Sequence, residues 1–476
     1  MAAHPPRDAV SNVGAHPPRS PTNLLRDSIT FSLGAFGYKA VALATVPVLA
    51  RLLQPAGLGL VDLATTIAGL VSVAVGLGFD QAVARHLRDE DGGVIWSSAL
   101  LGIASASVVA ALGTALVFVL GWSPAPQIPP GAISAGVIYG LSVAAFGVAL
   151  NALRLLRTPQ AYAVVTFAVA LCEGGIAVGI AAFSRDSVIL IVWTWAGVNA
   201  VAAGLLLMRL LPALRMPRLD TLRRLAAFGL PLVPASLAWA IADLAVRTHV
   251  GSAYGLAAVG VLGIATRVVS VLLLLIAGFS TAWHPAVYAM GRQQLGPRAE
   301  TVGLGLVVGL GIAGIGVSSL GRELVALAAG PAYSESIAAI APLSFGALGL
   351  GIFTVASAVH GYMATTIRVG VASLIGAAAQ VLLVAPAASA WNLAGVGVAV
   401  ATGYWIAAIL VAPAVIRGMS VRSRVLVFLA TGTSIAGLVG AWMLGNSEIG
   451  GRGAIAAVAA ASLAIIWMLR PRDAAR

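Results

Sequence analysis

The strongest constraint on the fold is a series of long apolar segments that recurs along almost the whole chain of 476 residues. Each segment holds about 20 residues, the length that an α-helix needs to cross a bilayer. The apolar residues are continuous and do not alternate with polar ones, which favours helices over the strands of a membrane barrel. We therefore predict an all-α polytopic membrane protein with fourteen spans: 28–50, 58–79, 94–120, 131–151, 161–183, 187–208, 227–249, 256–282, 301–319, 337–359, 369–389, 393–416, 424–444 and 453–469.

We predict between twelve and fourteen spans, because the ninth and the last two segments are rich in glycine or short and are the weakest candidates for a crossing. Charged residues make up only 9% of the chain, whereas a soluble domain carries about 25%. The mean hydropathy is +0.99. The chain is therefore not a soluble globular domain.

The basic residues are distributed unequally between the two sides of the membrane. With the N-terminus in the cytoplasm, 21 of the 28 basic residues fall in cytoplasmic segments. Only Arg51, Arg185, Arg322 and Arg452 fall in outer loops. This asymmetry follows the positive-inside rule, so we expect both termini in the cytoplasm and an even number of spans. The net charge of +12 reflects this topology and does not indicate a nucleic-acid partner.

The domain organisation follows from a weak internal repeat. The segments 52–79 and 252–279 align at a spacing of about 201 residues, with Gly59 on Gly260 and Ala64-Thr65 on Ala265-Thr266. Two parallel halves of six spans are a recurrent plan of transporters. We expect a disordered cytoplasmic tail at 1–23 and an N-lobe at 24–208. A cytoplasmic linker at 209–224 then leads to a C-lobe at 225–417, and residues 418–476 form two additional spans and a cytoplasmic C-terminus.

Several kinds of site are not indicated. Cys172 is the only cysteine, which excludes an intramolecular disulfide, and the six histidines are scattered without metal-ligand spacing. The chain has no P-loop. We expect no cofactor, no metal and no direct use of ATP. The N-terminal residues lack the apolar core of a signal peptide. Lys39 is the only lysine among abundant Ala, Gly, Val and Arg, a composition typical of a high-GC bacterium. We expect a multi-pass protein of the bacterial inner (plasma) membrane.

Two stretches resemble the Wzx-type polysaccharide flippases, which translocate lipid-linked oligosaccharides. The first stretch, residues 49–87, is similar to the opening of these flippases, which have a short turn followed by a span that ends in a Gly-Leu-Gly run. The matching residues of this chain are Leu49, Ala50, Arg51, Leu53, Pro55, Gly59, Leu60, Gly76, Leu77, Gly78, Ala82 and Arg85. In 323–366 the matching residues are Gly330, Tyr333, Ser334, Ile337, Ala338 and Leu343. The chain departs from the pattern at Ala56, where the family usually has an acidic residue. It departs again at Leu58-Gly59-Leu60, where the family usually has an aromatic residue after the glycine of the turn.

The resemblance covers about residues 24–420 and implies a MATE-like fold, that of the multidrug/oligosaccharidyl-lipid/polysaccharide exporters. Such a fold has two pseudo-symmetric six-helix lobes in a V that open alternately to each side. The last two spans resemble the additional helices of peptidoglycan-precursor flippases. The implied function is to flip a polyprenyl-diphosphate-linked oligosaccharide, such as a repeat unit of O-antigen, capsule or exopolysaccharide, to the outer leaflet. The expected partners are this glycan lipid, membrane lipid, H⁺ or Na⁺, and other polysaccharide-assembly membrane proteins.

Two other functions remain open. A MATE-type multidrug or cation antiporter would favour an acidic cavity, and the cationic residues within the spans argue against it. A polysaccharide polymerase, ligase or membrane glycosyltransferase would carry a large outer loop, and the outer loops here are short. Asp89-Glu90-Asp91 forms a bare DxD, the motif of metal-nucleotide enzymes, but no soluble domain surrounds it. We interpret it as part of an inner loop and do not expect an enzyme.

Basic residues within the spans are candidates for binding the diphosphate. A charged side chain at the bilayer centre costs about 2.5–3.5 kcal/mol or more, so such residues should face a cavity, water or a partner. Lys39 and Arg267 lie near mid-span in opposite lobes and are expected to face one cavity. The resemblance likewise links cations on these helices to the diphosphate. Arg247 is a third candidate, although Asp243, four residues away on the same helical face, can neutralise it. Lys39 and Arg267 each have the alternative of snorkelling to the membrane surface.

Carboxylates within the spans are candidates for proton or ion coupling: Glu173, Asp243 and Asp62. A buried carboxyl group holds its proton more tightly than an exposed one. Glu173 is alternatively a neutral acid bonded to a neighbour. Asp62 lies one turn below the outer surface and is expected to be hydrated, either pairing with Arg51 or capping its hairpin, or lying at the outer mouth of a transport cavity.

Aromatic and amide side chains in the spans are candidates for holding sugar rings: Trp193, Trp195, Trp239, Trp283, Asn151 and Asn199. Tryptophan at a span end more commonly marks the membrane interface, and this alternative is open for the four tryptophans. The sequence thus predicts alternating access around a cationic cavity, driven by an ion gradient or the membrane potential.

Overall fold

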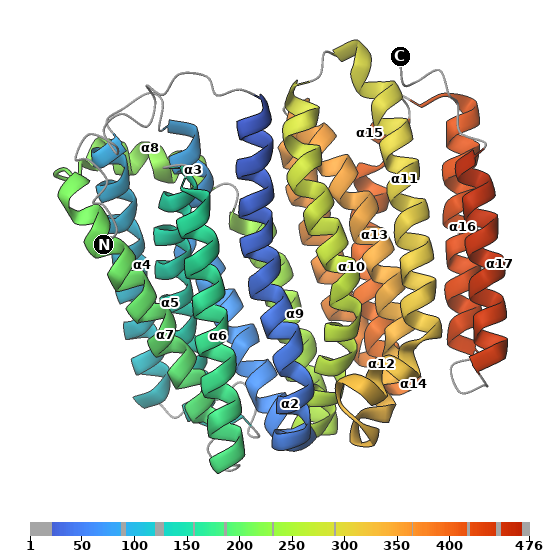
Figure 1. Ribbon diagram of the computed structural model, residues 1–476, viewed down its shortest axis with the longest axis horizontal. Helices are drawn as coiled ribbons and strands as arrows, with labels where there is room; N and C mark the ends of the chain where they lie inside the picture. Colours follow the sequence, from blue (N-terminus) through green and yellow to red (C-terminus); the bar gives the residue numbers. More distant parts are fainter. Residues whose placement is uncertain are drawn as a thin grey trace. The chain divides into compact units, whose positions relative to one another are not determined.

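The computed structural model describes residues 21–86, 92–119, 128–155, 158–184, 188–230, 233–289, 292–363, 365–416, 419–443 and 449–468. Within these ranges almost every residue is helical and no strand occurs (Figure 1). The long helices are α2 (Pro21–Gly76), α4 (Gly92–Val119), α5 (Pro130–Leu155), α6 (Pro159–Phe183), α7 (Val188–Leu210), α9 (Val233–Tyr254), α10 (Leu256–Ala289), α11 (Arg292–Ser319), α13 (Ile337–Tyr362), α14 (Thr366–Val411), α16 (Val421–Met443) and α17 (Ile449–Met468). The shorter ones are α3 (Phe79–His86), η1 (Leu211–Ala213), α8 (Leu219–Gly229), α12 (Gly321–Ala328), η3 (Pro331–Ser336) and α15 (Pro413–Ile416).

Two of the helices are too long for a single crossing. α2 has 56 residues and α14 has 46, whereas about 20 residues span a bilayer. Each is broken near its middle by a residue with positive φ: Gln54 at 58° in α2 and Asn392 at 50° in α14. Each therefore makes two crossings, which correspond to the predicted spans 28–50 with 58–79 and 369–389 with 393–416.

The predicted number of spans agrees with the helices of the described residues. Ten helices are long and apolar enough to cross a membrane, and α8 with α9 form an eleventh, bent by 60°. Counting α2 and α14 twice gives thirteen crossings, and α17 holds a shorter apolar helix, Ile455–Met468, so the helices agree with the predicted range of twelve to fourteen. The all-α fold class is confirmed for the described residues. The predicted seventh span, 227–249, covers the end of α8 and most of α9, with the bend between them.

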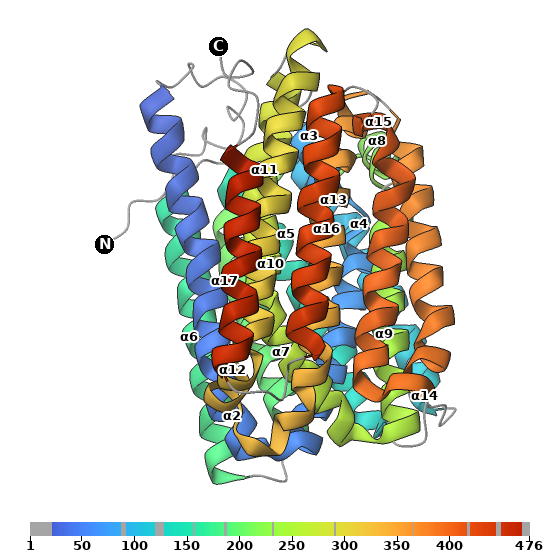
Figure 2. The ribbon, with the colours of Figure 1, turned by 90° about the vertical axis from the view of Figure 1, so that its right-hand side faces the viewer.

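The contacts divide the chain into two units, residues 1–240 and 241–476. In the first unit, α5 and α6 pack along α2, and α7 packs against α5 and α6. In the second unit, α13 packs against α10, α11, α14 and α16, and α16 and α17 pack side by side against α11 (Figure 2). The additional two helices are therefore integrated into the packing of the second unit.

Glycine allows two close approaches in the first unit. On α5, a Cβ at Gly140 would lie 2.6 Å from the carbonyl oxygen of Ala68 on α2, so the two helices touch through their backbones. At the end of α2, Gly78 has φ +65°, and its ideal Cβ would lie 2.6 Å from the carbonyl oxygen of Gly229 at the end of α8. The second approach fixes α8 beside the turn that leads from α2 into α3.

The short helices α3 and α8 cover one end of the first unit. They pack against each other and against α4. Phe79 of α3, Ile95 and Trp96 of α4, and Leu225 of α8 are buried in one apolar cluster. α3 and α8 are therefore attached to the bundle by their apolar faces and border the region where α2 and α5 end.

Candidate functional site

A buried carboxylate on α6 accepts hydrogen bonds from several other helices of the first unit. Glu173 lies on the buried stripe of α6, together with Val169, Ala170 and Ala177. This spacing follows the helical repeat and directs Glu173 into the unit. Only 8% of Glu173 is exposed. Burial of a carboxylate is costly unless it is hydrogen-bonded, so its partners decide whether the arrangement is stable.

Three side chains from three other helices donate hydrogen bonds to this carboxylate. The hydroxyl of Tyr38 on α2 donates to Oε2 at 2.8 Å. The amide of Asn199 on α7 donates to Oε1 at 2.6 Å, and the hydroxyl of Tyr139 on α5 donates to the same oxygen at 3.3 Å. The indole of Trp195 donates to the backbone carbonyl of Glu173 at 2.9 Å. We call these five residues the Glu173 centre.

Local sequence spacing holds the centre together. Trp195 and Asn199 lie four residues apart on α7, and the Asn199 amide also donates to the carbonyl of Trp195 at 2.9 Å. The rings of Tyr139 and Trp195 are in contact, with centroids 5.9 Å apart. Gly174, the residue after Glu173, lets α6 approach α2, because its ideal Cβ would already lie 2.8 Å from Oγ1 of Thr45. The centre is thus a rigid junction of α2, α5, α6 and α7.

The chemistry of the centre suits a proton better than a metal ion. The groups that face the carboxylate are N–H and O–H donors, which stabilise its charged form. When the carboxyl group is protonated, a tyrosine hydroxyl can turn and accept a hydrogen bond from the carboxyl O–H, because a hydroxyl is both donor and acceptor. A sodium ion would instead require several oxygen ligands directed at it. The arrangement therefore accommodates both protonation states of Glu173.

Lys39 lies directly after Tyr38 on α2 but on a different face of the helix. Successive residues of an α-helix are separated by about 100°, so Tyr38 points to Glu173 while Lys39 is exposed on the surface of the first unit. The same turn of α2 therefore carries Tyr38, a residue of the Glu173 centre, and Lys39, which is predicted to bind the diphosphate.

The two predicted cations of the second unit have different surroundings. Arg267 on α10 is half-buried and lies in electrostatic range of Tyr333 in η3. Arg247 on α9 is buried and forms an ion pair with Asp243. Since the pair is formed, Arg247 and Asp243 neutralise each other, which was one of the two alternatives. Tyr404 lies in electrostatic range of this pair.

The expectation for Asp62 is wrong in one respect. Asp62 is expected to be hydrated, and a place at the outer mouth of a transport cavity stays a prediction, but only 6% of Asp62 is exposed. The reason is packing: α5 covers this part of α2, and an ideal Cβ at Gly136 would lie 2.7 Å from the carbonyl oxygen of Ala64. The backbone carbonyl of Asp62 accepts hydrogen bonds from the hydroxyls of Thr65 and Thr66.

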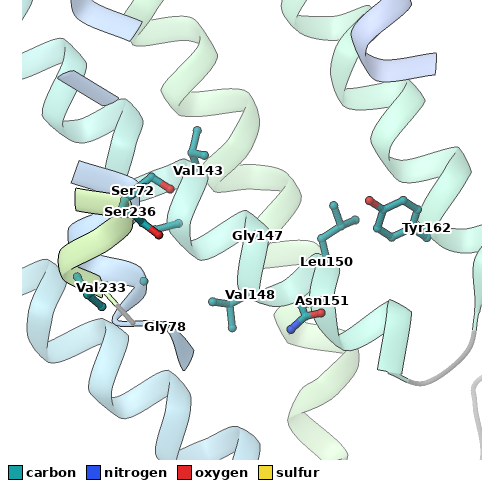
Figure 3. A pocket seen from close by; sticks show the side chains of 13 residues that line it. Ser72, Gly78, Val143, Gly147, Val148, Leu150, Asn151, Tyr162, Val233 and Ser236 are labelled. Carbon is teal, nitrogen blue, oxygen red and sulfur yellow. The ribbon is translucent and has the colours of Figure 1, made fainter. Parts of the chain in front are cut away.

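The predicted sugar-holding residues fall into several environments. Trp195 and Asn199 are engaged in the Glu173 centre. Trp283 is buried, stacks on Phe279 and donates to the carbonyl of Val355, so it is a packing residue. Trp193 is exposed and Trp239 is half-buried. Asn151 lines a cavity of about 400 Å³ in the first unit (Figure 3). Asp89-Glu90-Asp91 lies outside the described residues.

Sequence reasoning missed Tyr38 and Tyr139 as functional residues. Their position in the sequence was an available signal. Both tyrosines lie well inside apolar segments, whereas tyrosine in membrane proteins usually lies at the membrane interface. A hydroxyl that is buried far from the interface needs a partner. Pairing these tyrosines with the only carboxylate of the fifth span required the packing of α2, α5 and α6.

Comparison with known protein families gives one match. The family model described as polysaccharide biosynthesis protein matches residues 24–290, which is more than half of the chain. None of the curated proteins matches the chain.

Solved structures with similar folds are membrane transport proteins. The lipid II flippase MurJ, in an inward closed conformation, has a TM-score of 0.74 at 12% identity, over 94% of this chain and 100% of that chain. An inward-facing MATE family multidrug resistance transporter has a TM-score of 0.58 at 16% identity, over 83% of this chain and 96% of that one. A transporter of the MOP superfamily from Pyrococcus furiosus has a TM-score of 0.61 at 15% identity, over 88% and 98%. These similarities establish the fold.

Proposed function

The chain belongs to the polysaccharide biosynthesis protein family, and from this premise we propose that it flips a polyprenyl-diphosphate-linked oligosaccharide from the cytoplasmic to the outer leaflet of a bacterial inner membrane. The observation that carries the proposal is the family match in a chain whose fold resembles that of a lipid II flippase over its whole length. Both termini are cytoplasmic in this proposal, as the basic residues indicate.

The chemistry of such a substrate explains the cations within the spans. A diphosphate cannot enter hydrocarbon without a replacement for its hydration, and charge-assisted hydrogen bonds from lysine or arginine supply that replacement. We assign this role to Lys39, which is exposed, and to Arg267, which is half-buried. Arg247 contributes less, since Asp243 already neutralises it. The polyprenyl tail stays in the lipid.

We assign coupling to the Glu173 centre. Transport in one direction needs an energy source, and the chain has no P-loop. Protonation of Glu173 changes the hydrogen bonds that join α6 to Tyr38 on α2, and Lys39 follows Tyr38 on the same turn. A proton gradient therefore changes the protonation of Glu173 close to Lys39, the residue assigned to the diphosphate. This change biases the alternation between inward-open and outward-open states.

A MATE-type antiporter for cationic drugs is the second candidate function. The observation that favours it is the similarity of the fold to multidrug transporters of that family. The exposed Lys39 would repel a cationic drug, so the flippase is the better proposal.

The proposal is tested by complementation in a bacterium that lacks its own oligosaccharide flippase. We expect the wild type to restore surface glycan, and Lys39→Ala and Arg267→Ala to reduce it at least tenfold at equal protein levels. Arg368→Ala is the matched control, because Arg368 is an exposed arginine at the start of α14 and should not affect transport. A wild type that restores no glycan but confers drug efflux would contradict the proposal in favour of the antiporter.

A further inference from the structure

The ion pair on α9 joins a buried arginine to an accessible carboxylate of the same helix. Nη1 of Arg247 contacts Oδ1 of Asp243, and the exposed fractions of the two side chains are 10% and 52%. Arg247 belongs to the buried stripe of α9, together with Val246 and Val250. Side chains of a helix lean towards its N-terminus, which directs the guanidinium back to Asp243, one turn earlier. Asp243 is therefore the accessible partner of the pair, and Arg247 is the buried one.

The exposed side of Asp243 must border water. Asp243 lies near the middle of α9 (Val233–Tyr254), roughly 15 Å from either end of the helix at a rise of 1.5 Å per residue. A carboxylate that faced hydrocarbon at this depth would be costly. A polar ligand that enters this water-filled space therefore meets Asp243 first and Arg247 behind it.

The carboxylate of this pair can be exchanged but not simply lost. Ion pairs between residues four apart on one helix are weak where water reaches them. Loss of the carboxylate without a replacement is costly, however, because it leaves a buried guanidinium without its anion. Tyr404 of α14 lies in electrostatic range of both charges, but a tyrosine hydroxyl is neutral near pH 7 and does not replace an anion. Asp243 can therefore give way to another anion.

The charge of the incoming anion decides whether the exchange takes place. Asp243 is tethered beside Arg247, so its effective concentration is high, and a ligand of equal charge gains little by replacing it. Anionic phospholipids such as phosphatidylglycerol carry one negative charge on a phosphodiester. A diphosphate carries more charge, and two of its oxygens can accept parallel hydrogen bonds from one guanidinium. A diphosphate is therefore the better competitor for Arg247.

We propose that Asp243 guards Arg247, so that this arginine is closed to anionic phospholipids and opens to the diphosphate of the lipid-linked glycan. This inference rests on the proposed function and adds to it a residue that sets the specificity for the substrate. Arg247 joins Lys39 and Arg267 as a ligand only after the exchange. The displaced carboxylate stays in water, because Asp243 is already half-exposed.

The test measures binding of a labelled polyprenyl diphosphate to the purified full-length protein in nanodiscs of neutral phosphatidylcholine. Asp243→Asn removes the competing charge at nearly constant size. We expect this variant to bind the lipid about tenfold more tightly than the wild type, a ratio that one charge-assisted hydrogen bond can provide. Addition of phosphatidylglycerol to the nanodiscs should weaken this binding more in the variant than in the wild type, because the arginine of the variant is no longer guarded.

The matched control is Glu335→Gln, since Glu335 is an exposed acid of η3 in the same unit. It should keep the affinity of the wild type and its response to phosphatidylglycerol. The double variant Asp243→Asn/Arg247→Gln leaves the net charge unchanged and contains no buried guanidinium, so it gives a second test should Asp243→Asn fold poorly. We expect the double variant to bind polyprenyl diphosphate more weakly than the wild type, because it has lost the arginine that the diphosphate would gain.

Two results would overturn the guarding role of Asp243 alone. One is an Asp243→Asn variant that binds polyprenyl diphosphate no more tightly than the wild type, or that responds to phosphatidylglycerol as the wild type does. The other is a double variant that binds as tightly as the wild type. A wild type that binds no polyprenyl diphosphate would contradict the proposed function as well.

Discussion

At the scale of single residues, Glu173 shows how a membrane protein keeps a carboxylate inside a helical bundle. Its two oxygens receive donors from α2, α5 and α7, so the cost of burial is offset locally. The same donors become unsatisfied when the carboxylate is removed, and each buried donor without a partner costs about 1–3 kcal/mol. Stability and proton binding therefore depend on the same five residues.

Substitutions of the two tyrosines should have unequal effects. Tyr38→Phe removes a hydrogen bond of 2.8 Å, whereas Tyr139→Phe removes one of 3.3 Å. We expect Tyr38→Phe to lower the melting temperature of the purified protein more than Tyr139→Phe, with losses of roughly 0.5–1.5 kcal/mol for a neutral bond and more for a charged acceptor. Tyr162→Phe, outside the centre, is the control. Equal losses for Tyr38→Phe and Tyr139→Phe would show that the two bonds are equivalent.

The ion pair on α9 should show non-additive energetics. Asp243 is half-exposed and Arg247 is buried, so Asp243→Ala leaves a buried guanidinium without its carboxylate. Breaking a buried pair in this way typically costs about 3–5 kcal/mol, and the partial exposure of Asp243 reduces this figure. We expect Asp243→Ala to destabilise the protein more than Arg247→Ala does, and the double variant to recover part of the loss in a thermal-melt cycle. Strict additivity would argue against a direct coupling.

At the scale of elements, the junction between α2, α3 and α8 depends on one backbone conformation. Gly78 combines φ +65° with an approach to Gly229 that leaves no space for a Cβ. We expect Gly78→Ala to destabilise the first unit by about 1–3 kcal/mol, the usual cost of a strained backbone position. Gly76→Ala is the control, because its Cβ meets nothing within 4 Å. Equal melting temperatures for the two variants would show that this junction is not under such constraint.

The elements also show how far hydropathy reaches. It predicted the crossings within its range of twelve to fourteen, including the two within α2 and the two within α14, because apolar length decides whether a helix spans a bilayer. It gave no indication of the 60° bend between α8 and α9 inside the seventh span. Hydropathy separated the spans on either side of Gln54 and Asn392, but it did not predict that these two residues have a positive φ. That conformation depends on how the chain reverses direction.

At the scale of the whole molecule, the candidate residues were only partly predictable. Intramembrane charge identified Glu173 and the Asp243–Arg247 pair from the sequence, since such residues need partners. The tyrosines of the Glu173 centre and the burial of Asp62 were not predictable, because each depends on which helices pack together.

We propose that the chain moves a lipid-linked oligosaccharide across the membrane with the help of a proton at Glu173. The most direct measurement reconstitutes the purified protein in liposomes and follows transfer of a labelled polyprenyl-diphosphate oligosaccharide between leaflets, with and without a proton gradient. We expect transfer that the gradient accelerates, and a Glu173→Gln variant that is folded but insensitive to the gradient. Absence of transfer by the wild type, or an equal response of the variant to the gradient, would contradict this proposal.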